Sequence, residues 1–179
     1  MLKKIVLVSV GMFAAPIICG AQVQAQEISS HALVSTAKVV IPHVQEPPKL
    51  IDYAKAEPQG HGLKITDFRQ RSPADGAPIT RATTAYLSFD DTHFYAVFVA
   101  KDDPKLVRAR IAKREDIDGD DFVILELDTF RDKRHSFSFF VNPYGVQLDS
   151  KRTEGFEPDT NFDTQWESEG QLTEDGYVV

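Results

Sequence analysis

Sulfur-containing residues are almost missing from this chain. Cysteine occurs once and methionine twice in 179 residues, and all of them (Met1, Met12 and Cys19) lie before residue 20. The rest of the chain therefore cannot hold a disulfide framework, a cysteine-ligated zinc ion or a covalently attached haem. The five histidines show no haem-like pairing, so we expect neither haem nor a nucleotide as cofactor.

Positive charge is also scarce. Lysine and arginine number 20 against 27 aspartate and glutamate residues, which gives a net charge of −7. Nucleic acid is excluded as a partner because binding to phosphates needs a basic surface. The 42% of apolar residues and the chain length are typical of one folded domain.

The N-terminus has the pattern of a secretory signal peptide. Lys3 and Lys4 precede an uncharged apolar stretch over residues 5–20, and Val23 and Ala25 place a branched and a small residue at the two positions that a signal peptidase reads. We therefore predict a signal peptide over residues 1–25 and export to the periplasm, the outer membrane or the extracellular space. The alternative is a membrane anchor, but the apolar stretch of about 16 residues is shorter than the roughly 20 that a span needs.

The remaining chain alternates apolar and polar residues with a period of two. Residues 26–38 are polar and predict a flexible leader, and the body of the domain runs over 39–179. Short alternating runs separated by turn residues predict an all-β antiparallel sandwich. The expected strands cover residues 39–41, 85–89, 94–100, 107–111, 122–127, a hairpin within 135–150, 166–172 and 177–179.

Two turns support this interpretation. Asn142-Pro143-Tyr144-Gly145 has proline second and glycine fourth, as in a type I turn. A second turn over residues 173–176 leads into a strand that begins at Tyr177. A strand of three residues leaves backbone groups of its neighbour unpaired, so we expect a C-terminally incomplete sandwich, the first part of a longer protein.

Several short motifs resemble a known family. They include Thr66-Asp67-Phe68-Arg69, Leu127-Asp128-Thr129-Phe130 and Phe162-Asp163-Thr164-Gln165-Trp166, and they are spread over residues 39–179. Together they resemble the family-9-like carbohydrate-binding domains. The resemblance implies an immunoglobulin-like or jelly-roll β-sandwich that binds a poly- or oligosaccharide and is linked to carbohydrate catabolism by glycoside-hydrolase-type systems.

Within that superfamily, the chain resembles the N-terminal domains of large secreted bacterial proteins of unknown function. In these, the resemblance implies, the sandwich precedes a β-rich region that looks like an outer-membrane barrel. That region of the same chain is then a second expected partner. The alternative function is a periplasmic interaction domain that packs on the barrel and binds no sugar.

Candidate sugar-binding residues lie around the 142–145 turn. Aromatic faces stack on sugars, and amide, carboxylate and guanidinium groups form hydrogen bonds with hydroxyls. The candidates are Tyr144, Gln147, Asp149, Arg152 and Trp166. For Trp166, a role in the core is the favoured alternative because it lies within an expected strand.

An acidic loop gives a candidate calcium site. Its carboxylates are Asp116, Asp118, Asp120 and Asp121, and Ca²⁺ prefers six to eight oxygen ligands. The alternative is a solvated acidic turn beside Lys113 and Arg114.

One pair of carboxylates raises the question of catalysis. Glu126 and Asp128 are two residues apart on one expected strand, about 7 Å from each other, near the spacing in inverting glycoside hydrolases. No other sequence feature indicates an active-site cleft. We expect no catalytic residues in this domain, although the family is associated with hydrolysis of O-glycosyl compounds.

Overall fold

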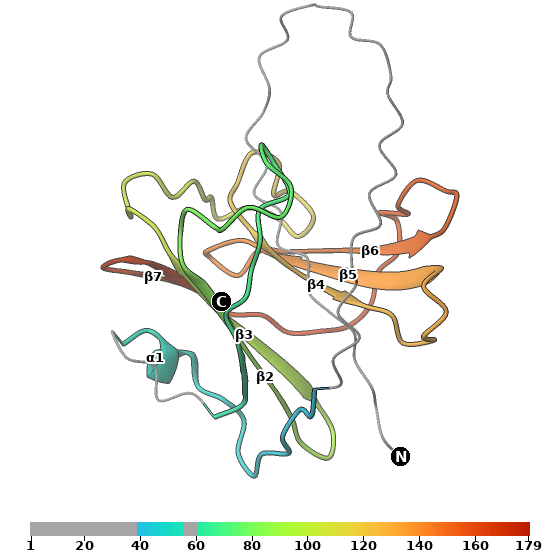
Figure 1. Ribbon diagram of the computed structural model, residues 1–179, viewed down its shortest axis with the longest axis horizontal. Helices are drawn as coiled ribbons and strands as arrows, with labels where there is room; N and C mark the ends of the chain where they lie inside the picture. The colour runs from blue at the N-terminus through green and yellow to red at the C-terminus, as the bar shows by residue number, and fades with distance from the viewer. Residues whose placement is uncertain (1–38, 56–60) are drawn as a thin grey trace, which may run out of the picture.

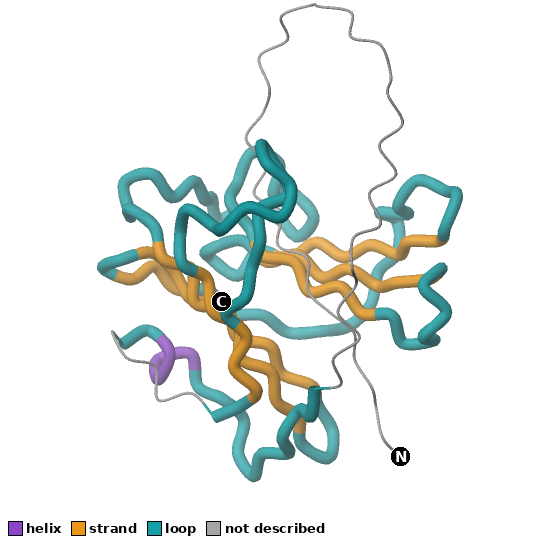
Figure 2. The backbone as a smooth tube through the Cα atoms, viewed as in Figure 1, coloured by secondary structure: helices purple, strands orange, loops and turns teal. Residues whose placement is uncertain are grey.

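The computed structural model describes residues 39–55 and 61–179. Within these ranges the chain forms eight strands and one single-turn helix, joined by long loops (Figures 1 and 2). All neighbouring strands pair in antiparallel fashion. The expected all-β antiparallel architecture is therefore confirmed for the described part of the chain.

The strands form two sheets. The larger has the order β1-β2-β3-β8-β7, and the smaller has the order β4-β5-β6. The larger sheet comprises β1 (Leu63–Ile65), β2 (Thr83–Phe89), β3 (Phe94–Lys101), β8 (Gly176–Val178) and β7 (Gln171–Thr173). The smaller comprises β4 (Val123–Leu127), β5 (His135–Val141) and β6 (Gln147–Thr153), and the helix α1 spans Leu50–Tyr53.

The central strands of the larger sheet, β2, β3 and β8, have buried side chains on both faces. Side chains alternate between the faces of a strand, so Phe98 and Ala100 of β3 join a cluster with Val123 and Val141 of the smaller sheet. Val97 and Val99 point the other way, and there they pack with Tyr53 of α1. This explains why residues 94–100 are apolar without interruption, as expected for a central strand.

The predicted strands at 85–89, 94–100, 122–127 and 177–179 are confirmed within one or two residues, and the predicted 135–150 hairpin is confirmed but extends to residue 153. Two others are wrong. Residues 107–111 form no strand, because the backbone N–H groups of Arg108 and Arg110 donate to the Asp121 and Asp120 carboxylates instead. Residues 39–41 form no strand with any described part of the chain; the contact with β2 lies further along, where His43 pairs with Phe89.

The predicted strand at 166–172 is mostly wrong as well. Regular pairing is confined to β7, although residues 161–170 keep the alternation of exposed and half-buried side chains. β1 and α1 were not predicted. The predicted signal peptide and leader lie outside the described residues. Among the described residues, no helix has the length and hydrophobicity needed to cross a membrane.

The tight turn between β2 and β3 contains a hydrogen bond whose effect on the pKa of a carboxyl group can be measured. The Tyr95 hydroxyl donates to Asp90 at 2.6 Å, which, with backbone N–H donors from Thr92 and His93, lowers the pKa of Asp90. The same bond raises the pKa of Tyr95 to about 12. A lowered pKa stabilises the fold above the unfolded-state value, and that contribution is lost as the pH falls through the folded-state value.

Replacing Tyr95 by phenylalanine is therefore expected to raise the pKa of Asp90 toward its ordinary value of about 3.9. An NMR titration of the carboxyl carbons measures this, with Tyr144→Phe as the control at a remote exposed tyrosine. An unchanged Asp90 titration in Tyr95→Phe would show that the hydroxyl does not set this pKa.

Candidate functional site

A long open groove runs between α1 and the edge strand β7. It consists of two adjoining hollows of about 760 Å³ and 470 Å³, which share Ile51 and Gln171. We call it the α1–β7 groove. Its lining residues are Pro48, Lys49, Leu50, Ile51, Ala54, Lys55, Tyr144, Glu169, Gly170, Gln171, Leu172, Thr173 and Glu174.

Tyr53 fixes the helical wall of the groove. Its side chain is only 2% exposed, and its ring lies edge-on to Tyr86 of β2 with 5.1 Å between centroids. The hydroxyl donates to the carbonyl of His61. With Tyr53 anchored beneath the helix, Ile51 remains 56% exposed and lines both hollows.

The 142–145 turn fixes the position of Tyr144 at one end of the groove. The buried Asn142 side chain accepts hydrogen bonds from the backbone N–H groups of Tyr144 and Val146, both at 2.9 Å. Its amide group donates to Asp120 at 2.8 Å. The turn is thus held from inside the protein, while the Tyr144 side chain is 42% exposed.

Gly170 allows the chain before β7 to touch this turn. A Cβ atom on Gly170 would lie 2.4 Å from the Gly145 nitrogen and 2.6 Å from the Pro143 carbonyl oxygen. Such distances are shorter than any ordinary contact, so only glycine fits without a backbone shift. Ser168 reinforces the contact by donating to the Gly145 carbonyl at 2.7 Å. The chain before β7 is therefore packed closely against the turn that carries Tyr144.

The other predicted sugar ligands lie away from this groove. Gln147 donates to the carbonyl of Trp166 at 3.1 Å. Arg152 is exposed on β6. Asp149 has no exposed surface and accepts hydrogen bonds from Arg114 at 2.7 Å and from the Thr164 N–H at 2.8 Å.

Trp166 packs inward. Its ring lies edge-on to Phe139 with 5.2 Å between centroids, and it joins the cluster between the two sheets. Its indole N–H is buried and has no hydrogen-bond partner among the described residues. These contacts favour the core role over the sugar-stacking role.

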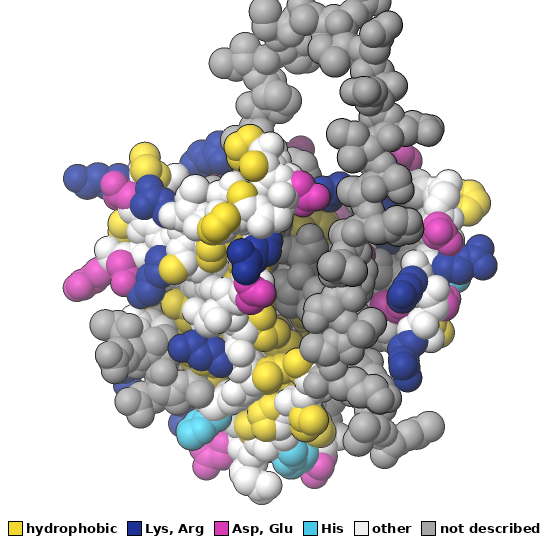
Figure 3. Space-filling view, viewed as in Figure 1, with side chains coloured by type: hydrophobic (Ala, Val, Ile, Leu, Met, Phe, Trp, Pro, Cys, Tyr) yellow, Lys and Arg dark blue, Asp and Glu magenta, His cyan; other side chains and the backbone are white. Residues whose placement is uncertain are grey.

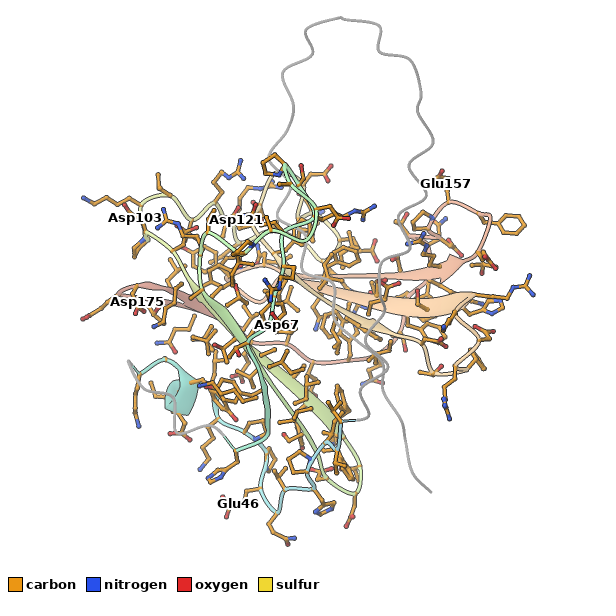
Figure 4. All side chains as sticks on the ribbon, viewed as in Figure 1. Glu46, Asp67, Asp103, Asp121, Glu157 and Asp175 are labelled. Atoms are coloured by element: carbon orange, nitrogen blue, oxygen red, sulfur yellow. The ribbon has the colours of Figure 1, made fainter. Side chains whose placement is uncertain are left out.

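The acidic loop of the predicted calcium site is held by arginines. Arg110 binds both Asp116, at 2.9 Å, and Asp120, at 3.2 Å, and these hydrogen bonds raise its pKa. Arg108 lies 3.3 Å from Asp121, which sits among the loop side chains in Figure 4, whereas Asp103 and Asp175 lie at the rim. No side-chain hydrogen bond of Asp118 is found in the described part.

A second acidic group has the spacing of a metal site. Carboxylate oxygens of Glu115, Asp149 and Asp163 lie within 4.8 Å of one another. The guanidinium of Arg114 lies between two of them, 2.7 Å from Asp149 and 2.9 Å from Asp163, and supplies positive charge there. Local sequence patterns do not predict this group, because its members are distant along the chain. Calcium binding by the acidic loop stays a prediction.

Each carboxylate of the possible catalytic pair has a structural contact. Glu126 accepts a hydrogen bond from the Ser136 hydroxyl at 2.5 Å. Asp128 lies after the end of β4 and accepts from the backbone N–H groups of Arg131 and Lys133, so it organises the following loop.

No family model, curated protein or solved structure gives a significant match to this chain. The resemblance to family-9-like carbohydrate-binding domains therefore stays a prediction from the sequence motifs.

Proposed function

We propose that this domain binds an oligosaccharide in the α1–β7 groove, with the Tyr144 ring as its stacking surface. The observation that carries the proposal is a half-exposed aromatic ring, on a rigid turn, at the end of a long open groove. Aromatic rings offer sugars an apolar face, and a rigid support reduces the entropy lost on binding.

The polar residues of the groove suit a neutral, hydroxylated ligand. Lys49, Glu169 and Gln171 line the hollow next to Tyr144, and together they offer donors and acceptors for hydroxyl groups. Lysine and glutamate occur in equal number along the groove. The chain as a whole is acidic, which disfavours an anionic ligand. A neutral glycan is compatible with both the balanced charges of the groove and the acidic net charge of the chain.

Binding is expected to be weak. A net hydrogen bond contributes about 1 kcal/mol and an aromatic contact about 1 kcal/mol more. Three or four such hydrogen bonds and one aromatic contact give about 4 to 5 kcal/mol, which corresponds to a dissociation constant near the millimolar range.

Titration calorimetry with xylo- and cello-oligosaccharides tests this proposal. We expect millimolar binding that Tyr144→Ala abolishes without unfolding the protein, because the side chain is largely outside the core. Phe156→Ala is the matched control: this ring is 75% exposed but lies outside the groove, so binding should persist. Loss of binding in Phe156→Ala with retention in Tyr144→Ala would place the sugar elsewhere.

A different observation favours the second candidate, an interaction domain that binds no sugar. Phe130 is 65% exposed and its ring lies 6.4 Å from Phe137, which in turn lies 5.3 Å from Phe162. Exposed aromatic groups are typical of protein interfaces. For an exported protein of this kind, we propose the β-rich, barrel-like region of the same chain as partner. A glycan array without any binder, on folded protein, would favour this function over the first.

A further inference from the structure

Three aspartates are followed directly by glycine in the described part of the chain, namely Asp75, Asp118 and Asp175. At such a step the glycine nitrogen can attack the carboxyl carbon of the preceding residue, because the two groups are held close together and glycine has no side chain to hinder the approach. The nitrogen bonds to the carboxyl carbon, and the carboxyl hydroxyl and the N–H proton leave as water. The product is a succinimide ring.

Water then opens the ring at one of its two carbonyl groups. Attack at the former side-chain carbonyl breaks its bond to nitrogen and restores aspartate. Attack at the backbone carbonyl breaks the other bond to nitrogen and gives isoaspartate, in which the chain continues through the side chain and the former backbone carbonyl becomes a carboxylate.

The ring closes most readily where the carboxyl group and the glycine N–H are both free, and the Asp175-Gly176 step has neither. Lys101 donates a hydrogen bond to the Asp175 carboxylate and lowers the pKa of Asp175, which disfavours the uncharged acid that loses its hydroxyl. Gly176 belongs to β8 and is paired on both sides, with Thr173 and Lys101. Several acidic side chains on the face seen in Figure 3 likewise lie beside basic ones.

The other two steps lie in turns of the same form. Asp75 and Asp118 are the second residues of the turns at 74–77 and 117–120, and each turn is closed by a backbone hydrogen bond from the fourth to the first residue, of 3.2 and 3.1 Å. The glycines have φ angles of 76° and 81°, and both Asp-Gly steps are exposed. No side-chain hydrogen bond or ion pair of either aspartate is found among the described residues.

The two turns differ in the glycine nitrogen. The Gly76 N–H donates to the Gln70 carbonyl at 2.8 Å, so this bond must open before the nitrogen can react. The Gly119 N–H has no acceptor within the described ranges. Arg110 does donate to the Asp118 carbonyl at 3.0 Å, but this contact comes from a half-exposed side chain and leaves the nitrogen free.

We propose that Asp118 is a site of isoaspartate formation, by ring closure with the Gly119 nitrogen, and that the bond to Gln70 protects the corresponding step at Asp75. The product adds one methylene group to the backbone of the acidic loop. Asp120, two residues further on, binds Arg110 and Asn142 through its carboxylate. The modification would therefore act on the loop that supports the 142–145 turn.

Peptide mapping of the folded protein after long incubation in warm neutral buffer tests the proposal. The buffer contains a chelator, so that no cation holds the carboxylates. Electron-based fragmentation in the mass spectrometer distinguishes isoaspartate from aspartate at each step. We expect formation at Asp118 to be faster than at Asp75 by about fivefold or more, the factor that corresponds to opening one ordinary hydrogen bond.

The same incubation in urea is the control for the effect of sequence. Once the chain is unfolded, only the neighbouring side chains differ, so the ratio of the two rates should fall to about two or less. The variants Asp118→Asn and Asp75→Asn give a second measurement, because asparagine closes the same ring with loss of ammonia. Their deamidation rates in the folded protein should differ in the same direction.

Equal rates at Asp118 and Asp75 in the folded protein would overturn the proposal. A ratio that persists in urea would do the same, because the preference would then come from the neighbouring residues and not from the hydrogen bond of Gly76. So would a folded protein without isoaspartate at Asp118 at a time when the unfolded chain already contains it.

Discussion

Replacement of Arg114 by methionine is expected to destabilise the protein by about 3 kcal/mol. The Arg114 guanidinium binds the fully buried Asp149 carboxylate and also donates to the Thr164 carbonyl, and its bond to Asp149 raises the pKa of Arg114. Without the guanidinium, Asp149 keeps a buried charge with one N–H donor, that of Thr164. Urea unfolding monitored by circular dichroism measures the loss.

The double variant Arg114→Met/Asp149→Asn is its control. Asparagine keeps an acceptor for the Thr164 N–H but carries no charge, so most of the lost stability should return. If the double variant is as unstable as Arg114→Met alone, the cost comes from lost packing of the arginine and not from a stranded charge.

Truncation of Trp166 to alanine is expected to cost about 3 kcal/mol, as for other large-to-small changes in a core. The ring contacts Phe139 and fills space between the two sheets. Trp166→Phe should cost much less, because it keeps most of the packing and removes an indole N–H that is buried without a partner. Thermal unfolding of both variants measures the difference.

The same variants separate the two roles of Trp166. If Trp166→Ala folds with unchanged stability but no longer binds oligosaccharide, Trp166 is the stacking surface and the assignment to Tyr144 is wrong. We expect the reverse, a destabilised variant whose folded fraction still binds.

Much of the fold could be predicted from local patterns. The uninterrupted apolar run at 94–100 predicted β3, and the alternation at 85–89 predicted β2. The pattern of apolar residues along a strand depends directly on whether one or both of its faces are buried. The Asn-Pro-Tyr-Gly turn was predictable because its residue types select the backbone angles. These elements can be predicted without knowing which distant segments they contact.

The features that sequence patterns missed depend on distant contacts. Residues 107–111 alternate like a strand, but carboxylates from residues 120 and 121 take up their N–H groups. The α1–β7 groove joins a helix near residue 50 to a strand near residue 171. Tyr144 could be singled out as an exposed turn aromatic, whereas its neighbours Lys49, Glu169 and Gln171 could not, since no local pattern brings them together.

Mapping the binding surface by NMR is the most direct test of oligosaccharide binding in the α1–β7 groove. In a titration of isotope-labelled protein with xylo- or cellohexaose, amide shifts should concentrate at Lys49, Tyr144, Gly170 and Gln171. The chemical shifts of the amides around Phe130 and Phe156 should not change. Saturable shifts confined to the region of Phe130 and Phe156, or no shifts at millimolar sugar, would contradict the account.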